Sequence, residues 1–231
     1  FLIGDLKANC NYDSLSITEP VDTKFGHTLF GRKLLREHLI DVSDEDYGIT
    51  IDPVFDFSGG QDMDASKSMK MNSRGVMLQG SIGKRFSFHT TFYENQATFA
   101  EYMNDYVHKS RVVPGGSRVK TFGTNSFDFA WATGVMNYRL DKHFTFQFGH
   151  DKNFIGDGYR SLLLSDNAFA YPFFKIITDL GKIRYWNMFA VMQDLQKDVI
   201  DDGERFRQKY GSFHYLDINL GKRFTVGVFE A

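Results

Sequence analysis

The sequence predicts an all-β protein, an antiparallel β-barrel that spans a membrane with its strands. Three observations indicate this fold class. Aromatic residues make up 16% of the chain, with 24 Phe and 11 Tyr against 4 Pro, a composition typical of strands. Apolar and polar residues alternate with a period of two over most of the chain. Tight turns and long connections alternate along the sequence, which places all the tight turns at one rim of the sheet.

Bulk composition excludes several classes of protein. A chain of 231 residues with 42% hydrophobic and 24% charged residues is expected to fold. The net charge of −2 offers no basic surface for nucleic acid. The single cysteine, Cys10, permits no internal disulfide and no Cys/His metal site, so we interpret it as a buried or tolerated thiol. No apolar run reaches the length of a transmembrane helix, but transmembrane strands need no such run.

Residues 1–46 are predicted to form an irregular lead-in that contains one short amphipathic helix. Over residues 30–40, Leu34, Leu35, His38 and Leu39 recur at helical spacing, opposite a charged face. No second metal ligand lies one turn from His38. We therefore expect this histidine to be packed or hydrogen-bonded at the edge of a core.

From residue 47 to residue 231 the pattern predicts barrel strands. In the segment 144–149 the phenylalanines occupy one face, and Thr145, Gln147 and Gly149 occupy the other. Most of the other segments show a similar division into an apolar face and a small or polar face. The candidate strands cover residues 47–57, 74–82, 86–93, 127–140, 144–149, 173–180, 183–192, 213–220 and 224–229.

The connections between these strands fall into two kinds. Tight turns, built from an apolar residue, Gly or Asp, and Lys before the next strand, are expected at residues 82–86, 140–144, 180–185 and 220–224. Long connections are expected at residues 62–71, 94–126, 151–171 and 193–212. This asymmetry, with an apolar-out and polar-in alternation, is typical of an outer-membrane β-barrel. The alternatives are a soluble barrel that binds a hydrophobic ligand, a sandwich, and the less suitable propeller. Because the predicted strand number is odd, we expect an incomplete barrel, such as the N-terminal half of a larger one.

The segment 149–168 is the densest run of special residues and is predicted to be a fixed surface loop. Its glycines suit backbone conformations that other residues avoid. Asp151, Asn153, Asp157 and Asp166 loosely resemble a calcium loop, but the full Asp-x-Asx-x-Asx-Gly spacing and the distal glutamate are missing. We therefore expect no metal site, and predict that the carboxylates cap turns and pair with Lys152 or Arg160.

The segment 94–126 is the second informative loop. A Glu-Asn-Gln run opens it, and Phe99, Tyr102, Met103 and Tyr106 then recur at helical spacing, which predicts a helix within residues 97–110. Loops rich in aromatic and amide side chains suit carbohydrate, because sugar rings stack on aromatics and amides bind hydroxyls. The alternative is a loop that folds back to plug the lumen. The candidate polysaccharide-binding residues are Glu94, Asn95, Gln96, Asp151, Asn153, Asp157, Tyr159 and Arg160.

Several of these motifs together resemble a known family. They are the run Gly31 to Leu39, Asn72-Ser73-Arg74-Gly75, Tyr93-Glu94-Asn95-Gln96-Ala97, Val113-Pro114-Gly115 and the loop from Gly149 to Asn167. The combination, over roughly residues 30 to 190, resembles the outer-membrane capsule-assembly proteins of the Wzi type, in the branch that includes the gliding-motility protein RemB.

This resemblance implies a barrel in the outer membrane of a Gram-negative bacterium, with a short helix near the periplasmic end and a role in holding surface polysaccharide. The expected partners are outer-membrane lipid, surface polysaccharide and other outer-membrane proteins. We expect no catalytic residues and no cofactor. A structural subunit of a gliding-motility or secretion complex is the alternative function.

Overall fold

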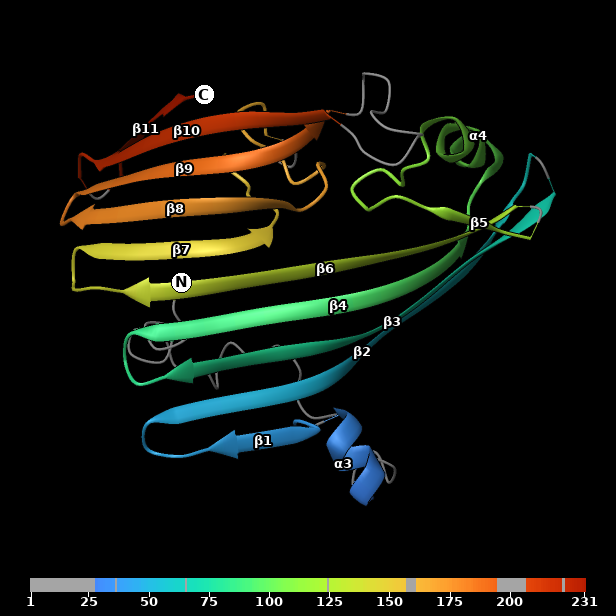
Figure 1. Cartoon of the computed structure of the whole chain (residues 1–231), viewed down its shortest axis with the longest axis horizontal. Helices are drawn as coiled ribbons and strands as arrows, with labels where there is room; N and C mark the ends of the chain where they lie inside the picture. The colour runs from blue at the N-terminus through green and yellow to red at the C-terminus, as the bar shows by residue number, and fades with distance from the viewer. Residues whose placement is uncertain are drawn as a thin grey trace.

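The computed structural model describes residues 28–35, 37–64, 66–123, 125–156, 161–194, 207–221 and 223–231. These residues form one large antiparallel sheet and two helices (Figure 1). The helices are α3 (Leu29–Leu35) and α4 (Glu101–Ser110). The strands are β1 (Ile40–Ser43), β2 (Tyr47–Asp62), β3 (Lys67–Ile82), β4 (Phe86–Thr98), β5 (Lys120–Phe122), β6 (Ser126–Arg139), β7 (Phe144–Asp151), β8 (Tyr171–Leu180), β9 (Ile183–Asp194), β10 (Arg207–Asn219) and β11 (Thr225–Glu230).

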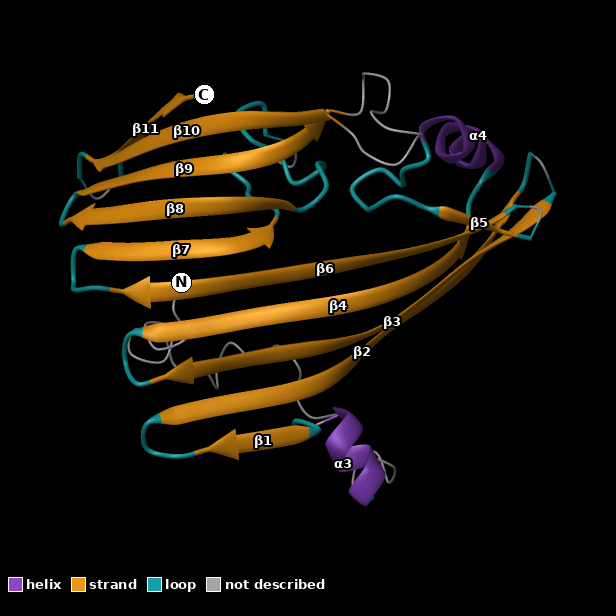
Figure 2. Ribbon diagram, viewed as in Figure 1, coloured by secondary structure: helices purple, strands orange, loops and turns teal. Residues whose placement is uncertain are grey.

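The sheet confirms the all-β, antiparallel part of the predicted fold. Its 11 strands follow the order β1-β2-β3-β4-β6-β7-β8-β9-β10-β11, and β5 pairs with β6 off this path. Neighbours on the path are therefore also neighbours in the sequence, apart from the short β5. The described sheet is open, with β1 and β11 at its two edges (Figure 2). No helix in the described ranges is long and apolar enough to cross a membrane.

The connections lie at the two rims much as the sequence pattern predicts. The four predicted tight turns join β3 to β4, β6 to β7, β8 to β9 and β10 to β11, and a further short turn joins β1 to β2. All of them lie at the left of Figure 1. We call this edge the tight-turn rim and the opposite edge the long-loop rim. One predicted long connection, residues 62–71, is wrong, because β2 and β3 continue as a paired hairpin and only residues 63–66 link them.

Element ends differ from prediction where long-range pairing overrides the local pattern. The helix expected over residues 30–40 ends at Leu35, and Ile40 instead pairs with Ile51 in the sheet. His38 is exposed, and its Nδ1 lies 2.6 Å from Asp52 Oδ2, so the expected hydrogen bond forms outside any core. The helix expected within residues 97–110 begins only at Glu101. The lead-in up to residue 27, with Cys10, lies outside the described residues.

The two faces of the sheet differ in character. Cross-strand register places Phe92, Phe148, Phe174 and Phe189 on one face, which we call the apolar face. In the described ten strands of the path, every exposed large apolar side chain lies on this face. These side chains are Ile40, Val42, Tyr47, Phe55, Phe57, Val76, Ile82, Phe92, Met136, Tyr138, Phe144, Phe148, Phe174, Leu180, Ile183, Phe189, Tyr210, Val226 and Val228.

The opposite face, which we call the covered face, carries the cores of the molecule. One cluster joins Ala97, Phe127 and Phe129 of the sheet to Val107 of α4. The other consists of Val135, Tyr171, Phe173, Met188, Ala190 and Phe213, with Leu164 from the β7–β8 connection packed against it. Helix α4 and the long connections therefore bury the part of this face nearer the long-loop rim, and the apolar face has no partner within the described chain.

Toward the tight-turn rim the covered face is polar. Gln147 Nε2 donates to Asn137 Oδ1 at 2.8 Å, and Arg184 Nε donates to Asp179 Oδ1 at 2.5 Å. In the β6–β7 turn the backbone amides of His143 and Phe144 donate to Asp141, and these bonds hold the pKa of its carboxyl below the usual value. Near this rim the sheet thus has one apolar face and one polar face.

Candidate functional site

A polar cluster on the covered face lies where β7 ends and the β7–β8 connection begins. Asp151 Oδ2 lies 3.6 Å from Nε2 of His89, a residue of β4, and Asp151 Oδ1 accepts the backbone amide of Lys152. Two residues further on, Asn153 is buried and its Oδ1 accepts a 2.5 Å hydrogen bond from Lys175 Nζ of β8. Two of the predicted site residues, Asp151 and Asn153, are thus brought to one place.

Lys175 is the centre of this cluster. Its Nζ lies 5.2 Å from the ring centroid of Phe173 and 5.1 Å from that of Trp186, so two aromatic faces stabilise the ammonium in addition to Asn153. Asn153 and the Tyr171 hydroxyl are both buried and act on each other, although no partner of Asn153 Nδ2 or the hydroxyl meets strict hydrogen-bond geometry. The arrangement places hydrogen-bonding groups beside aromatic rings.

The structure separates the other predicted site residues. Asn95 lies on the covered face, where it is buried and its Nδ2 donates to the Phe129 carbonyl at 3.2 Å. Glu94 and Gln96 lie on the apolar face of the same strand, because successive strand residues point to opposite faces. These three residues therefore form no common site. Asp157, Tyr159 and Arg160 lie outside the described residues.

The predicted pairing of the loop carboxylates with Lys152 is not what the structure shows. The Lys152 ammonium donates to the Gly115 carbonyl at 2.7 Å and lies 5.4 Å from the Trp131 ring centroid. Only its backbone amide binds Asp151. Lys152 thus ties the β7–β8 connection to the β4–β6 connection. Within the described residues no three His, Cys, Asp or Glu side chains come together as a metal site.

A cavity of about 500 Å³ lies beside this contact, at the long-loop rim. It is bounded by residues 116–118 of one long connection and 168–170 of the other, and by strand residues that include His150, Gln193 and Gln208. Sequence reasoning missed these strand residues because they belong to three different strands, β7, β9 and β10, which only the assembled sheet brings together. A second cavity of about 460 Å³ lies between α4 and residues 119–121.

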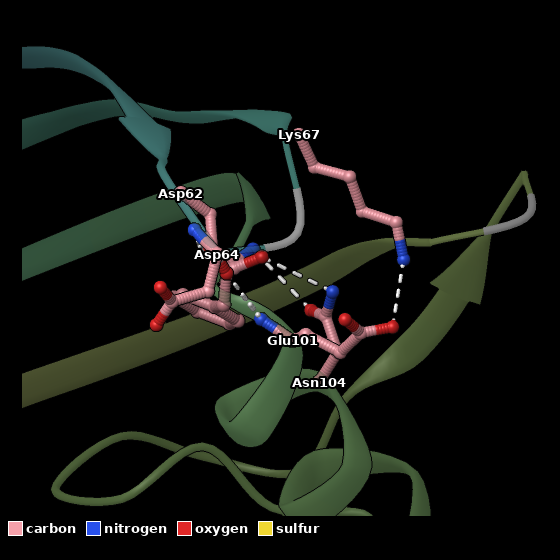
Figure 3. A network of polar contacts seen from close by, with 6 residues as sticks. Asp62, Asp64, Lys67, Glu101 and Asn104 are labelled. Atoms are coloured by element: carbon pink, nitrogen blue, oxygen red, sulfur yellow. Dashed lines mark hydrogen bonds and ion pairs between the residues drawn. The ribbon is translucent and has the colours of Figure 1, made fainter.

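The tip of the β2–β3 hairpin is tied to the start of α4 (Figure 3). The residue before the helix, Ala100, offers no side-chain cap, and Asp62 Oδ2 instead accepts the Glu101 amide at 3.1 Å. Lys67 Nζ donates to Glu101 Oε1 at 2.9 Å, and this bond raises the pKa of Lys67. Asn104 binds both the amide and the carbonyl of Phe99. Together these contacts position α4 over the covered face.

Gly149 of β7 is expected to tolerate no side chain. A Cβ at this position would lie 2.4 Å from the Gly134 carbonyl oxygen and 2.9 Å from Val135 Cα, both backbone atoms that cannot move aside. Gly149→Ala is predicted to lower the free energy of unfolding by about 1–3 kcal/mol, measured by urea unfolding. Gly48→Ala is the matched control, since the nearest atom there, Ser81 Oγ, is 4.0 Å away. Equal unfolding midpoints for the two variants would contradict the steric argument.

Comparison of the chain with protein-family models, curated proteins and solved structures finds no match. Functional conclusions therefore depend on the geometry of the sheet and its rims.

Proposed function

We propose that the chain is the strand region of an outer-membrane β-barrel whose long-loop rim holds or assembles surface polysaccharide. The observation that carries the membrane part is the apolar face. Phe57, Phe148 and Phe189 are 68%, 57% and 50% exposed there, and exposed apolar side chains extend from β1 to β11. A soluble domain rarely leaves such a continuous apolar surface in water, whereas a lipid-facing barrel surface requires it.

The rims support the same proposal. Short turns at one rim and long connections at the other are the arrangement of bacterial outer-membrane barrels, in which the long loops face the cell exterior. Polar pairs such as Gln147 with Asn137 lie on the covered face, which would line the lumen, and α4 with the long connections would partly fill it. Closure requires that the free edges of β1 and β11 pair with each other or with further strands.

The polysaccharide part rests on the resemblance to capsule-assembly proteins and on side chains at the long-loop rim. Asn153, Tyr171 and Trp186 place hydrogen-bonding groups next to aromatic faces around Lys175, a combination that binds sugar hydroxyls and rings. In this proposal the residues of the β7–β8 connection contact the polysaccharide. No catalytic role is proposed for them.

Membrane insertion is tested by flotation. The purified chain is mixed with phospholipid vesicles after dilution from urea, and the vesicles are floated on a density gradient. We expect the chain to float with the vesicles and to require detergent for a monodisperse state in their absence. A chain that is monodisperse in plain buffer and stays at the bottom of the gradient would instead be a soluble β protein that binds a hydrophobic ligand.

A structural role in a gliding-motility or secretion complex is the second candidate, and one feature of the apolar face favours it. Tyr185, Asn187, Ser212 and His214 form a hydrogen-bonded polar cluster among the apolar residues of β9 and β10. Polar groups on a lipid-facing surface are costly and often mark contacts with another protein. Replacing residues 151–168 by a flexible linker separates the two candidates: lost polysaccharide retention supports the first, and full retention supports the second.

A further inference from the structure

The cavity at the long-loop rim occupies a notch in the sheet. β7 ends at Asp151 and β8 begins at Tyr171, whereas the flanking strands β6 and β9 extend further. β6 pairs with β7 only from Gly134 onward, and β9 pairs with β8 only as far as Ala190. Two long connections cover the notch, joined by the bond from Lys152 to Gly115. The cavity of about 500 Å³ is the space that remains.

Within the notch, side chains bind the backbone carbonyls on the edge of β6 that β7 leaves unpaired. Ser117 Oγ donates to the Ala130 carbonyl at 2.6 Å, and His150 Nδ1 lies 2.9 Å from the Ala132 carbonyl. Side chains therefore replace the strand partner that β7 does not supply. Because these carbonyls are already bonded, the β6 edge of the notch is unsuited to an added β-strand.

The cavity lies one row of residues beyond an exposed row of phenylalanines on the apolar face. Phe148, Phe174 and Phe189 are direct cross-strand neighbours in that row. Two residues further along the same strands, His150, Pro172 and Val191 line the cavity. Successive same-face residues are about 6.6 Å apart along a strand. An acyl chain that lies along the strand direction, over one of these phenylalanines, would thus bring its polar headgroup to the cavity.

The polar lining of the cavity suits hydroxyl groups. Gln193 and Gln208 are direct neighbours across β9 and β10, and Tyr210 donates to Gln208 Oε1 at 3.1 Å. Each amide offers both a donor and an acceptor, as sugar hydroxyls do, whereas a phosphate needs donors only. His150 leaves its Nε2 for a ligand, and its ring meets Phe169 at a centroid distance of 5.9 Å. No aspartate or glutamate is among the described lining residues, and their one arginine or lysine, Arg118, already takes part in another interaction of the chain.

We propose that this cavity binds the sugar headgroup of a membrane glycolipid whose acyl chains run along the strand direction over Phe148, Phe174 and Phe189. The inference rests on the proposed membrane function, and adds a site in the notch, where Tyr171 is the residue that it shares with the Lys175 cluster. Phe169 and Pro172 provide apolar surface for the sugar ring, and the two glutamines bind its hydroxyls.

The experiment compares two detergents with the same acyl chain, dodecyl maltoside and dodecylphosphocholine. The full chain is transferred into a mixed micelle, and the molecules that it retains are counted by native mass spectrometry. We expect the variant Gln193→Leu with Gln208→Leu to bind dodecyl maltoside about tenfold more weakly and dodecylphosphocholine as before, because only the sugar loses its hydrogen bonds. Gln61→Leu, an exposed amide at the β2–β3 tip, is the matched control and is expected to change neither.

The outcomes are distinct. If the double variant binds both detergents as well as the native chain does, or loses both to the same extent, the headgroup site is overturned. The membrane proposal is unaffected by either result. A native chain that retains neither detergent and is monodisperse in plain buffer overturns the membrane proposal, and this inference with it. If the double variant does not fold, as judged by its urea unfolding curve, the single variants Gln193→Met and Gln208→Met provide the same comparison with nearly unchanged side-chain shape.

Discussion

Replacing Phe148 by arginine is expected to cost about 2 kcal/mol in the free energy of folding into a bilayer, less than at the middle of the membrane, because Phe148 lies one row of residues from the proposed headgroup cavity. Phe148 is on the apolar face between Met136 and Phe174, and its side chain is more than half exposed. In a lipid-facing position the guanidinium must leave water or distort the bilayer, and this penalty is largest near the middle of the membrane. The measurement is a urea titration of folding into phospholipid vesicles.

The adjacent residue provides the control for Phe148. Gln147 lies on the covered face of the same strand and donates to Asn137. Gln147→Arg is expected to cost about 1 kcal/mol, the value of one hydrogen bond, because a polar lumen accepts a charge. The variant Phe148→Leu measures the free-energy cost of losing the aromatic ring alone, so that the cost of the arginine charge can be obtained by difference. A penalty for Phe148→Arg no larger than that for Gln147→Arg would mean that the apolar face does not meet lipid.

Phe127→Ala is expected to lower the free energy of unfolding by about 3–5 kcal/mol. The Phe127 side chain is fully buried on the covered face, with its ring centroid 5.9 Å from that of Phe99 and 5.0 Å from the ring of His108 in α4. Truncation leaves a cavity between the sheet and the helix. Urea unfolding in detergent measures the loss, and hydrogen exchange over residues 101–110 should show faster opening of α4.

Phe122→Ala is the matched control for Phe127, because the Phe122 ring is exposed on β5. Its expected effect is within about 0.5 kcal/mol. If the two variants have the same stability, α4 is not held by this core, and the proposal that α4 partly fills the lumen fails with it.

Much of the sheet could be predicted from local sequence because strands and turns leave local signals. Alternation identified a part of each strand from β2 to β11 except β5, and the Gly-Lys or Asp-Lys turns identified the tight-turn rim. The far ends of β2 and β3 were missed, since residues 58–61 and 67–73 alternate weakly. They are strands because each supplies the other with backbone hydrogen bonds. β1 was missed because long-range pairing overrides the local pattern. Ile40 belongs to a helix-like stretch of sequence, but in the structure it pairs with Ile51 of β2.

The candidate site was predicted only in part. Asp151 and Asn153 lie together because they belong to one loop that Lys175 reaches from the next strand. Glu94, Asn95 and Gln96 were grouped by adjacency, although strand geometry directs Asn95 away from its two neighbours. The cavity could not be predicted, because Gln193 and Gln208 meet only when β9 pairs with β10.

The sequence by itself determined which residues share a face and which connections share a rim, because both follow from the two-residue period of strands and from turn chemistry. The tertiary structure decided what lies on each face. The contacts from Lys152 to Gly115 and from Lys67 to Glu101 join residues more than thirty positions apart. Such contacts depend on how long connections fold back over the sheet, which local periodicity does not encode. They cover one face and leave the apolar face, with its notch, exposed.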